Sequence, residues 1–336
     1  MTLEILVETA FAPVAEALAA GRIPGAVLAV ADAAGGRAIR FGGFAQVEPN
    51  AAAMRADTVF DLASLTKVVF TTTRVLDLVA AGRIGLDDPL AAAIPDLRQY
   101  DVASAPERRL TVRQCLTHQT HLPAVEPLYT YGRDPHTLRA FVLQRAWKAG
   151  PPVYSDINFI LLGILIERLT GVPMADQPLP PGFTFRPEAA SCAATERCTW
   201  RDRVMRGEVH DENAFALGGA SGHAGLFGAA AALLHFAAGL LAAPQSPVWT
   251  RQTPTRSLGW EMAHQGWSGG DACSPTTIGH TGFTGTGLWL DADAGLAWTL
   301  LTNRVHPTRH HDSGIVTLRR AVGDAIQTTI KGLRID

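Results

Sequence analysis

The sequence predicts an α+β fold: one antiparallel sheet flanked by two terminal helices, with a mainly helical subdomain inserted into it. Strand-like runs occur towards both ends of the chain, helical patterns dominate the middle, and a helical pattern closes each end. Strands from both ends can join one sheet if the middle forms a unit of its own. The expected subdomains are therefore 1–60 plus 220–336 and 61–219, with the ligand site in the cleft between them.

The elements of the sheet layer lie at the two ends of the chain. A helical pattern covers 3–20 and ends at Gly21. Strands at 25–31 and 38–41 follow, and the glycine pair 35–36 joins them as a hairpin. The later elements are strand-like runs near 257–262, 276–281, 286–291 and 296–302 and a helix over about 314–331.

The middle of the chain is helical, with candidate helices at 65–81, 111–117, 136–147 and 157–170. The stretch Ala224–Ala243 has His235 as its only polar residue and is long enough to span a bilayer. Its centre carries that histidine, and no basic flank or aromatic belt follows it. We therefore expect a buried helix of a soluble protein there.

Charge and cysteine content exclude several classes of protein. The 336 residues carry a net charge of −2, and the 29 basic residues comprise 26 arginines and three lysines without a basic block. A nucleic-acid or membrane partner is therefore not expected. Four cysteines are too sparse for a disulfide scaffold, and the N-terminus does not resemble a signal peptide. We expect a cytoplasmic protein.

Ser64 and Lys67 are the first candidate catalytic pair. Residues at i and i+3 share a helix face, so the hydroxyl and the amine can meet. A desolvated lysine with a lowered pKa can take the proton of a serine nucleophile. With ten serines and three lysines in the chain, only about 0.1 chance matches to this spacing are expected. The structural alternative is a helix cap with an exposed lysine.

Two later motifs complete the set. Tyr154, just before the helix at 157–170, can act as a general base or proton relay, and Asp156 can hydrogen-bond to Lys67. His280, Thr281 and Gly282 end a strand, where Gly282 allows close approach and the strand edge can bind an extended ligand. A capped helix and a glycine-rich hairpin are the structural alternatives.

The three motifs in this order resemble the serine β-lactamase and penicillin-binding protein superfamily, in particular its class C-like branch. That branch also contains D,D-carboxypeptidases, D-aminopeptidases and esterases. The resemblance covers about 25–320 and also includes the stretches 116–118 and 222–227. It implies a β-lactamase/transpeptidase-like fold, no metal and no cofactor. It further implies an acyl-enzyme on Ser64, with Lys67 and Tyr154 sharing the proton transfers and the N–H groups of Ser64 and Phe283 forming the oxyanion hole.

Two positions depart from the family pattern. Asp156 replaces an amide and would pair strongly with Lys67. His280 replaces the more frequent lysine and is largely neutral at pH 7, which weakens the case for an efficient β-lactamase. We therefore expect an esterase or peptidase acting on a small ester or peptide substrate. Asn303 and Arg304 are candidate contacts for a substrate carboxylate, with a strand-end salt bridge as the alternative.

Several alternatives stay open. A D,D-carboxypeptidase or weak β-lactamase is the enzymatic rival, and a binding protein that has kept the fold but lost turnover is the other. The polar stretch 208–213 with His223 matches no zinc-ligand spacing, so we expect a polar network under the site there and no metal.

Overall fold

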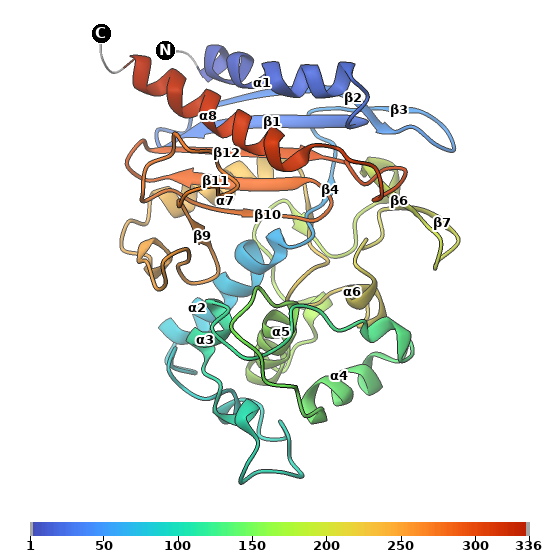
Figure 1. Ribbon diagram of the computed structural model, residues 1–336, viewed down its shortest axis with the longest axis vertical. Helices are drawn as coiled ribbons and strands as arrows, with labels where there is room; N and C mark the ends of the chain where they lie inside the picture. Colours follow the sequence, from blue (N-terminus) through green and yellow to red (C-terminus); the bar gives the residue numbers. More distant parts are fainter. Residues whose placement is uncertain (1–2, 334–336) are drawn as a thin grey trace.

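The computed structural model describes residues 3–333, and its central element is a seven-stranded antiparallel sheet (Figure 1). β1 pairs with β12, so strands from the two ends of the chain are hydrogen-bonded neighbours, as predicted. Both are apolar runs buried along nearly their whole length, which suits the middle of a sheet covered on both faces. The strands, in order across the sheet, are β3 (Ala52–Ala53), β2 (Arg37–Gln46), β1 (Gly25–Asp32), β12 (Leu296–Thr302), β11 (Thr286–Asp291), β10 (Ile278–Thr281) and β9 (Glu261–Met262).

Helices cover both faces of this sheet. α1 (Leu3–Ala19) and α8 (Ile315–Leu333) lie side by side on one face (Figure 1). Successive side chains of a strand point to opposite faces, so β1 contributes to two cores. Leu28 packs with α1 and α8, whereas Val27 belongs to the core on the opposite face, where α7 (Ala230–Leu241) packs. The predicted α+β class is confirmed.

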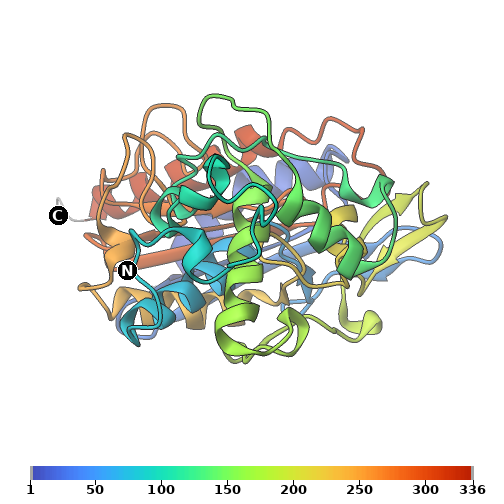
Figure 2. The ribbon, with the colours of Figure 1, turned by 90° about the horizontal axis from the view of Figure 1, so that it is seen from below.

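A layer of helices lies below the sheet in Figure 1. α5 runs through the middle of this layer (Figure 2), and its residues from Ile157 to Ile166 are all buried. A helix that is apolar all round must be surrounded by other elements. The expected division into two subdomains stays a prediction. The helices are α2 (Thr73–Ala80), α3 (Val112–Leu116), α4 (Pro135–Gln144), α5 (Asp156–Thr170) and α6 (Glu212–Ala216).

Short strands connect this layer to the sheet. β8 (Phe227–Gly228) pairs with both β4 (Phe60–Asp61) and β5 (Phe183–Thr184), and β4 leads directly to Ser64. A separate hairpin, β6 (Ala194–Cys198) with β7 (Arg203–Arg206), was not predicted, because its arginines and cysteines do not alternate as a half-buried strand does.

One predicted helix is partly π-helical, and another begins later than expected. The helix over 65–81 begins at Leu65 as predicted, but Lys67–Thr72 are π-helical before α2. The alanine-rich stretch becomes helical only at Ala230, because a bridge between Ser221 and Ala224 and then β8 occupy its first residues. His235 lies on the exposed side of α7, so this helix is amphipathic rather than fully buried. No helix within residues 3–333 has both the length and the apolarity needed to cross a membrane.

Glycine at two facing positions lets the loop before α7 touch α5. A Cβ atom on Gly222 would lie 2.0 Å from the carbonyl oxygen of Phe159, and one on Gly163 would lie 2.8 Å from the nitrogen of Gly222. Neither contact is physically possible, so the backbones would have to separate. This contact also positions His223, whose carbonyl faces the candidate site.

We expect Gly222→Ala to lower the free energy of unfolding by about 2–3 kcal/mol, because backbone atoms of α5 must shift to admit the methyl group. Gly239→Ala is the matched control: it lies in α7 with no atom within 4 Å of the added Cβ. There alanine should stabilise the helix by up to about 1 kcal/mol. Urea unfolding of both variants checks this, and equal midpoints would contradict it.

Candidate active site

Ser64 follows a strained turn at the end of β4. The Asp61 carboxylate accepts hydrogen bonds from the N–H groups of Ala63 (2.8 Å) and His210 (2.6 Å). Ala63 has φ 47°, in the left-handed region that residues with a side chain rarely adopt. Burial raises the pKa of Asp61 to about 6. Asp61 was not predicted, although a carboxylate two residues before a turn amide is a recognisable signal.

Lys67 is fully buried directly beneath Ser64. Its ammonium donates to Ser64 Oγ (2.8 Å) and to the carbonyl oxygen of His223 (3.1 Å). It also pairs with Asp156 Oδ1 at 2.8 Å. The ammonium thus makes two hydrogen bonds and one ion pair. The Ser64–Lys67 contact predicted from the i, i+3 spacing is present even though a π-helical turn begins at Lys67, a feature frequent at functional sites.

The pKa of Lys67 lies above its ordinary value, contrary to the expected lowered value. Burial alone lowers this pKa, but the charge of Asp156, followed by the interactions with Tyr154, raises it more. The departure at Asp156 is the physical reason, since a carboxylate stabilises the charged amine where an amide would not. Lys67 therefore carries its proton at neutral pH, and its ammonium donates to the Ser64 hydroxyl.

The segment before α5 fixes Tyr154 and Asp156 through its main chain. The N–H of Ser155 donates to His118 Nδ1 (3.0 Å), and the N–H of Asp156 donates to the carbonyl of Ala124 (2.8 Å). The His118 ring lies 4.5 Å from the Tyr154 ring, centroid to centroid. Burial, followed by the charge of Arg256, holds the pKa of His118 well below its usual value, so it is neutral. His118 thus has a structural role, because it fixes the segment that carries Tyr154.

Two cations flank the Tyr154 ring. Lys67 Nζ lies 5.1 Å and Arg256 Cζ 5.3 Å from its centroid. His280 is the next ring, at 5.9 Å. His280 is buried, and its Nδ1 lies 3.0 Å from the carbonyl oxygen of Thr281, which can only accept. Burial, followed by the charge of Lys67, lowers the pKa of His280 well below its usual value, so this position supplies no positive charge.

Gly282 is required by packing within the protein. A Cβ atom there would lie 2.5 Å from the carbonyl oxygen of Leu62 and 2.1 Å from Thr286 Oγ1. We expected Gly282 to let the backbone approach a substrate closely. Its role seen here is internal, because the absence of a side chain lets the end of β10 pack against the turn that carries Ser64. Within residues 3–333, the N–H groups of Ser64 and Phe283 donate to no protein acceptor.

Ser64 lies between two cavities. Three residues, Ser64, Asp156 and Phe283, line both of them. The first, of about 360 Å³, is also lined by Tyr154, Arg256, Glu261, His280 and Thr281. The second, of about 320 Å³, is also lined by Ala63, Val125, Pro127, Tyr129, His210, Asp211, Glu212, Asn213, Ala224 and Arg309.

Arg256 and Glu261 were not predicted as site residues. They precede and begin β9, a strand only two residues long, so no local pattern marks them. Their position follows from the pairing of β9 with β10 at the edge of the sheet.

Two predicted substrate contacts lie outside both cavities. Asn303 is buried, and its amide donates to the carbonyls of Phe44 and Ala45, which is a role within the protein. Arg304 donates to the carbonyl of Phe283 (2.9 Å) and lies over that ring. It holds the loop that carries Phe283 and does not face a substrate carboxylate.

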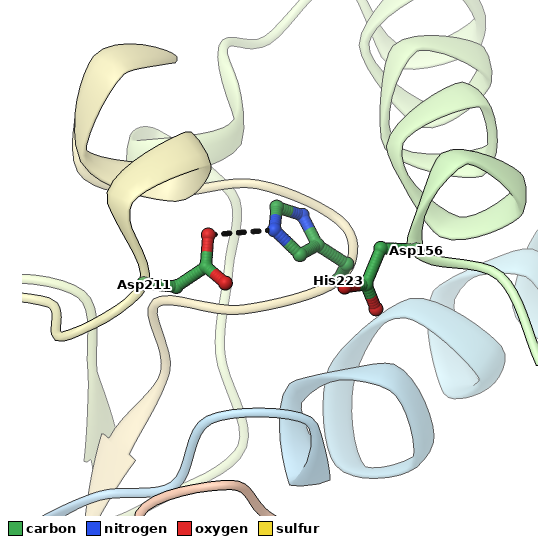
Figure 3. Close-up of side chains that lie close together, drawn as sticks. All are labelled: Asp156, Asp211 and His223. Atoms are coloured by element: carbon green, nitrogen blue, oxygen red, sulfur yellow. Dashed lines mark hydrogen bonds and ion pairs between the residues drawn. The ribbon is translucent and has the colours of Figure 1, made fainter. Parts of the chain in front are cut away.

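Asp156, Asp211 and His223 offer ligand atoms within 4.8 Å of one another, as a metal site would require (Figure 3). Each already has a partner within the protein, however. His223 Nε2 lies 2.9 Å from Asp211 Oδ1, and Asp156 holds the Lys67 ammonium. A metal ion would lie beside that charge, so this set fits the polar network expected under the site better than a metal centre.

Comparisons with known proteins agree with this geometry. The family model described as Beta-lactamase matches residues 11–322. The chain belongs to the beta-lactamase family. It is a hydrolase of this family, and the resemblance and the fold predicted from the three motifs are confirmed.

Individual members of the beta-lactamase family match along most of the chain. An N-acetylmuramyl-L-alanine amidase of Bacillus subtilis is 31% identical, over 86% of this chain and 79% of that protein. A putative D-alanyl-D-alanine carboxypeptidase of Escherichia coli K12 is 29% identical, over 74% and 70%. The solved beta-lactamase of Sulfitobacter sp. EE-36 has a TM-score of 0.74 at 22% identity and covers 99% of both chains.

Proposed function

We propose that this chain is a serine hydrolase that cleaves an ester or a peptide-type substrate through an acyl-enzyme on Ser64. The observation that carries the proposal is the 2.8 Å contact between Ser64 Oγ and the buried Lys67 ammonium, at a point where two cavities meet. A serine that only capped a helix would not need a fully buried cation beneath it.

The proton path follows from the charges around Ser64. Lys67 is already protonated, so its ammonium stabilises the developing alkoxide and does not accept the proton. Tyr154 lines the same cavity as Ser64, and its ring lies near the cations of Lys67 and Arg256. We assign Tyr154 as the base that takes the Ser64 proton and passes it to the leaving nitrogen or oxygen. In the second half, Tyr154 takes a proton from the water that attacks the acyl-enzyme and returns it to Ser64 Oγ as the acid product leaves.

The unpaired N–H groups of Ser64 and Phe283 are suited to bind the oxyanion that forms when Ser64 attacks. Such a donor typically contributes a factor of about 10²–10³ in rate. Phe283 is held by Arg304 and by the close packing of Gly282, so this donor is fixed before the substrate binds. The names of the amidase and carboxypeptidase relatives support a substrate with an amide bond.

We expect a fluorophosphonate to add one adduct to the wild-type chain and none to Ser64→Ala, as measured by intact mass. Ser104 is an exposed serine outside the three motifs, so Ser104→Ala should be labelled like the wild type. Tyr154→Phe should be labelled about 10²–10⁴-fold more slowly, because it lacks the base. An adduct on Ser64→Ala would overturn the proposal, and no adduct on the wild type would favour a non-catalytic binding protein.

One observation favours a D,D-carboxypeptidase as the second candidate. Arg256 lines the first cavity, and its buried Nη1 has no hydrogen-bond partner among residues 3–333. A substrate carboxylate would supply that partner, and His280 offers no charge in its place. A peptide with a free C-terminal carboxylate therefore suits this cavity, with its leaving group on the Arg256 side of Ser64.

If a carboxylate binds Arg256, then Arg256→Gln should lower kcat/KM about 10–100-fold more for a D-alanyl-D-alanine peptide than for its C-terminal amide. Comparing the two substrates removes any common effect of Arg256 on Tyr154. An equal loss on both substrates would exclude this cavity as a carboxylate site and leave the esterase alternative in place.

A further inference from the structure

The second cavity beside Ser64 has carboxylate oxygens that no protein group uses. Asp211 Oδ1 accepts from the N–H of Ala214 (2.7 Å) and pairs with His223 (Figure 3), whereas its Oδ2 has no donor within residues 3–333. Glu212 Oε1 accepts from Arg309, and its Oε2 is likewise without a donor there. Their side chains are 31% and 20% exposed, so both can be reached from the cavity.

The positive charge in this cavity is already neutralised. Arg309 pairs with Glu196 and with Glu212, each at 2.6 Å. Three carboxylates line the wall; Asp156 is paired with the buried Lys67, Asp211 with His223 and Glu212 with Arg309. Among residues 3–333, no unpaired cation lines this cavity, so a substrate carboxylate would face the unused oxygens of Asp211 and Glu212 without a counter-charge of its own.

His210 is a second, independent indication of a ligand. It is 3% exposed, it lines this cavity, and neither of its ring nitrogens has a hydrogen-bond partner in the described part of the chain. Burial, then the charge of Arg309, lowers its pKa to about 3, so the ring is neutral. Apart from Ser64 and Asn213, whose amide bonds to main-chain groups of Glu126 and Tyr129, the remaining wall is apolar or aromatic, with Tyr129 and Phe283 as the large rings.

We propose that the second cavity binds the acyl part of the substrate and selects acyl groups that carry hydrogen-bond donors, hydroxyl or ammonium, over acyl groups that carry a carboxylate. Free carboxylate oxygens accept from such donors, and the rings of Tyr129 and Phe283 pack against the carbon skeleton that carries them. This inference rests on the proposed function, because it places the carbonyl carbon at Ser64 and the leaving group in the first cavity.

Four nitrophenyl esters of hexanoic acid test it, with the terminal acyl carbon carrying hydrogen, hydroxyl, ammonium or carboxylate. In the wild type, kcat/KM for the hydroxyl or the ammonium ester should exceed that for the carboxylate ester by at least about tenfold. The better substrate of the hydroxyl and ammonium esters shows whether the cavity selects acyl groups with a hydroxyl or with an ammonium. The unsubstituted ester is the internal reference.

Two variants locate the effect. Glu212→Gln keeps an oxygen for Arg309 but removes the negative charge from the cavity wall. It should lower the ratio of kcat/KM for the ammonium ester to kcat/KM for the carboxylate ester about tenfold. Glu196→Gln is the matched control, because Glu196 also pairs with Arg309 but does not line the cavity; its preference should equal that of the wild type.

Equal rates with all four esters, or the same change in both variants, would overturn the selectivity. Labelling of Ser64 by the fluorophosphonate is independent of the acyl cavity, so its persistence would show that the proposed function survives. Loss of labelling would instead overturn the proposed function itself.

Discussion

The site depends on the burial of one positive charge. The Lys67 ammonium is fully buried, and the effective cost of removing such an ion from water is several kcal/mol unless partners replace the water. Its three partners come from three parts of the fold: the turn after β4, the start of α5 and the loop before α7. The packing that brings these segments together, including the glycine contact between Gly222 and α5, is therefore also what holds Ser64 over a charged group.

Asp156 and His280 change the distribution of charge relative to the family pattern. Asp156 keeps Lys67 charged, and His280 is neutral. Among the residues described, Arg256 is therefore the cation in the first cavity that still has an unused hydrogen-bond donor. The second cavity has the opposite character, with unused carboxylate oxygens on Asp211 and Glu212. We propose that Ser64 lies between one wall suited to an anion and one suited to hydrogen-bond donors, and that this difference fixes the orientation in which a substrate binds.

Local features of the sequence predicted much of this arrangement. The i, i+3 spacing of Ser64 and Lys67 fixes their contact, and the apolar runs of β1 and β12 fix the centre of the sheet. Features that depend on distant segments were missed or wrong. Asn303 ends a strand in the expected place, but its side chain donates to carbonyl groups of β2. The pairing of Lys67 with Asp156, 89 positions away, was expected, but the direction of the resulting change in the Lys67 pKa was not. Arg256 enters the site only through the pairing of β9 with β10.

The pKa of Lys67 is the most direct test of this account. The chain has only three lysines, so ¹³C labelling of the lysine side chains yields three resonances that single substitutions assign. In the wild type, the Lys67 resonance should remain that of a charged amine up to a pH above 10.5, the ordinary lysine value. In Asp156→Asn it should lose its proton at lower pH, because burial then acts without the compensating carboxylate. A wild-type Lys67 that titrates below 10.5, or one that Asp156→Asn leaves unchanged, would contradict the account.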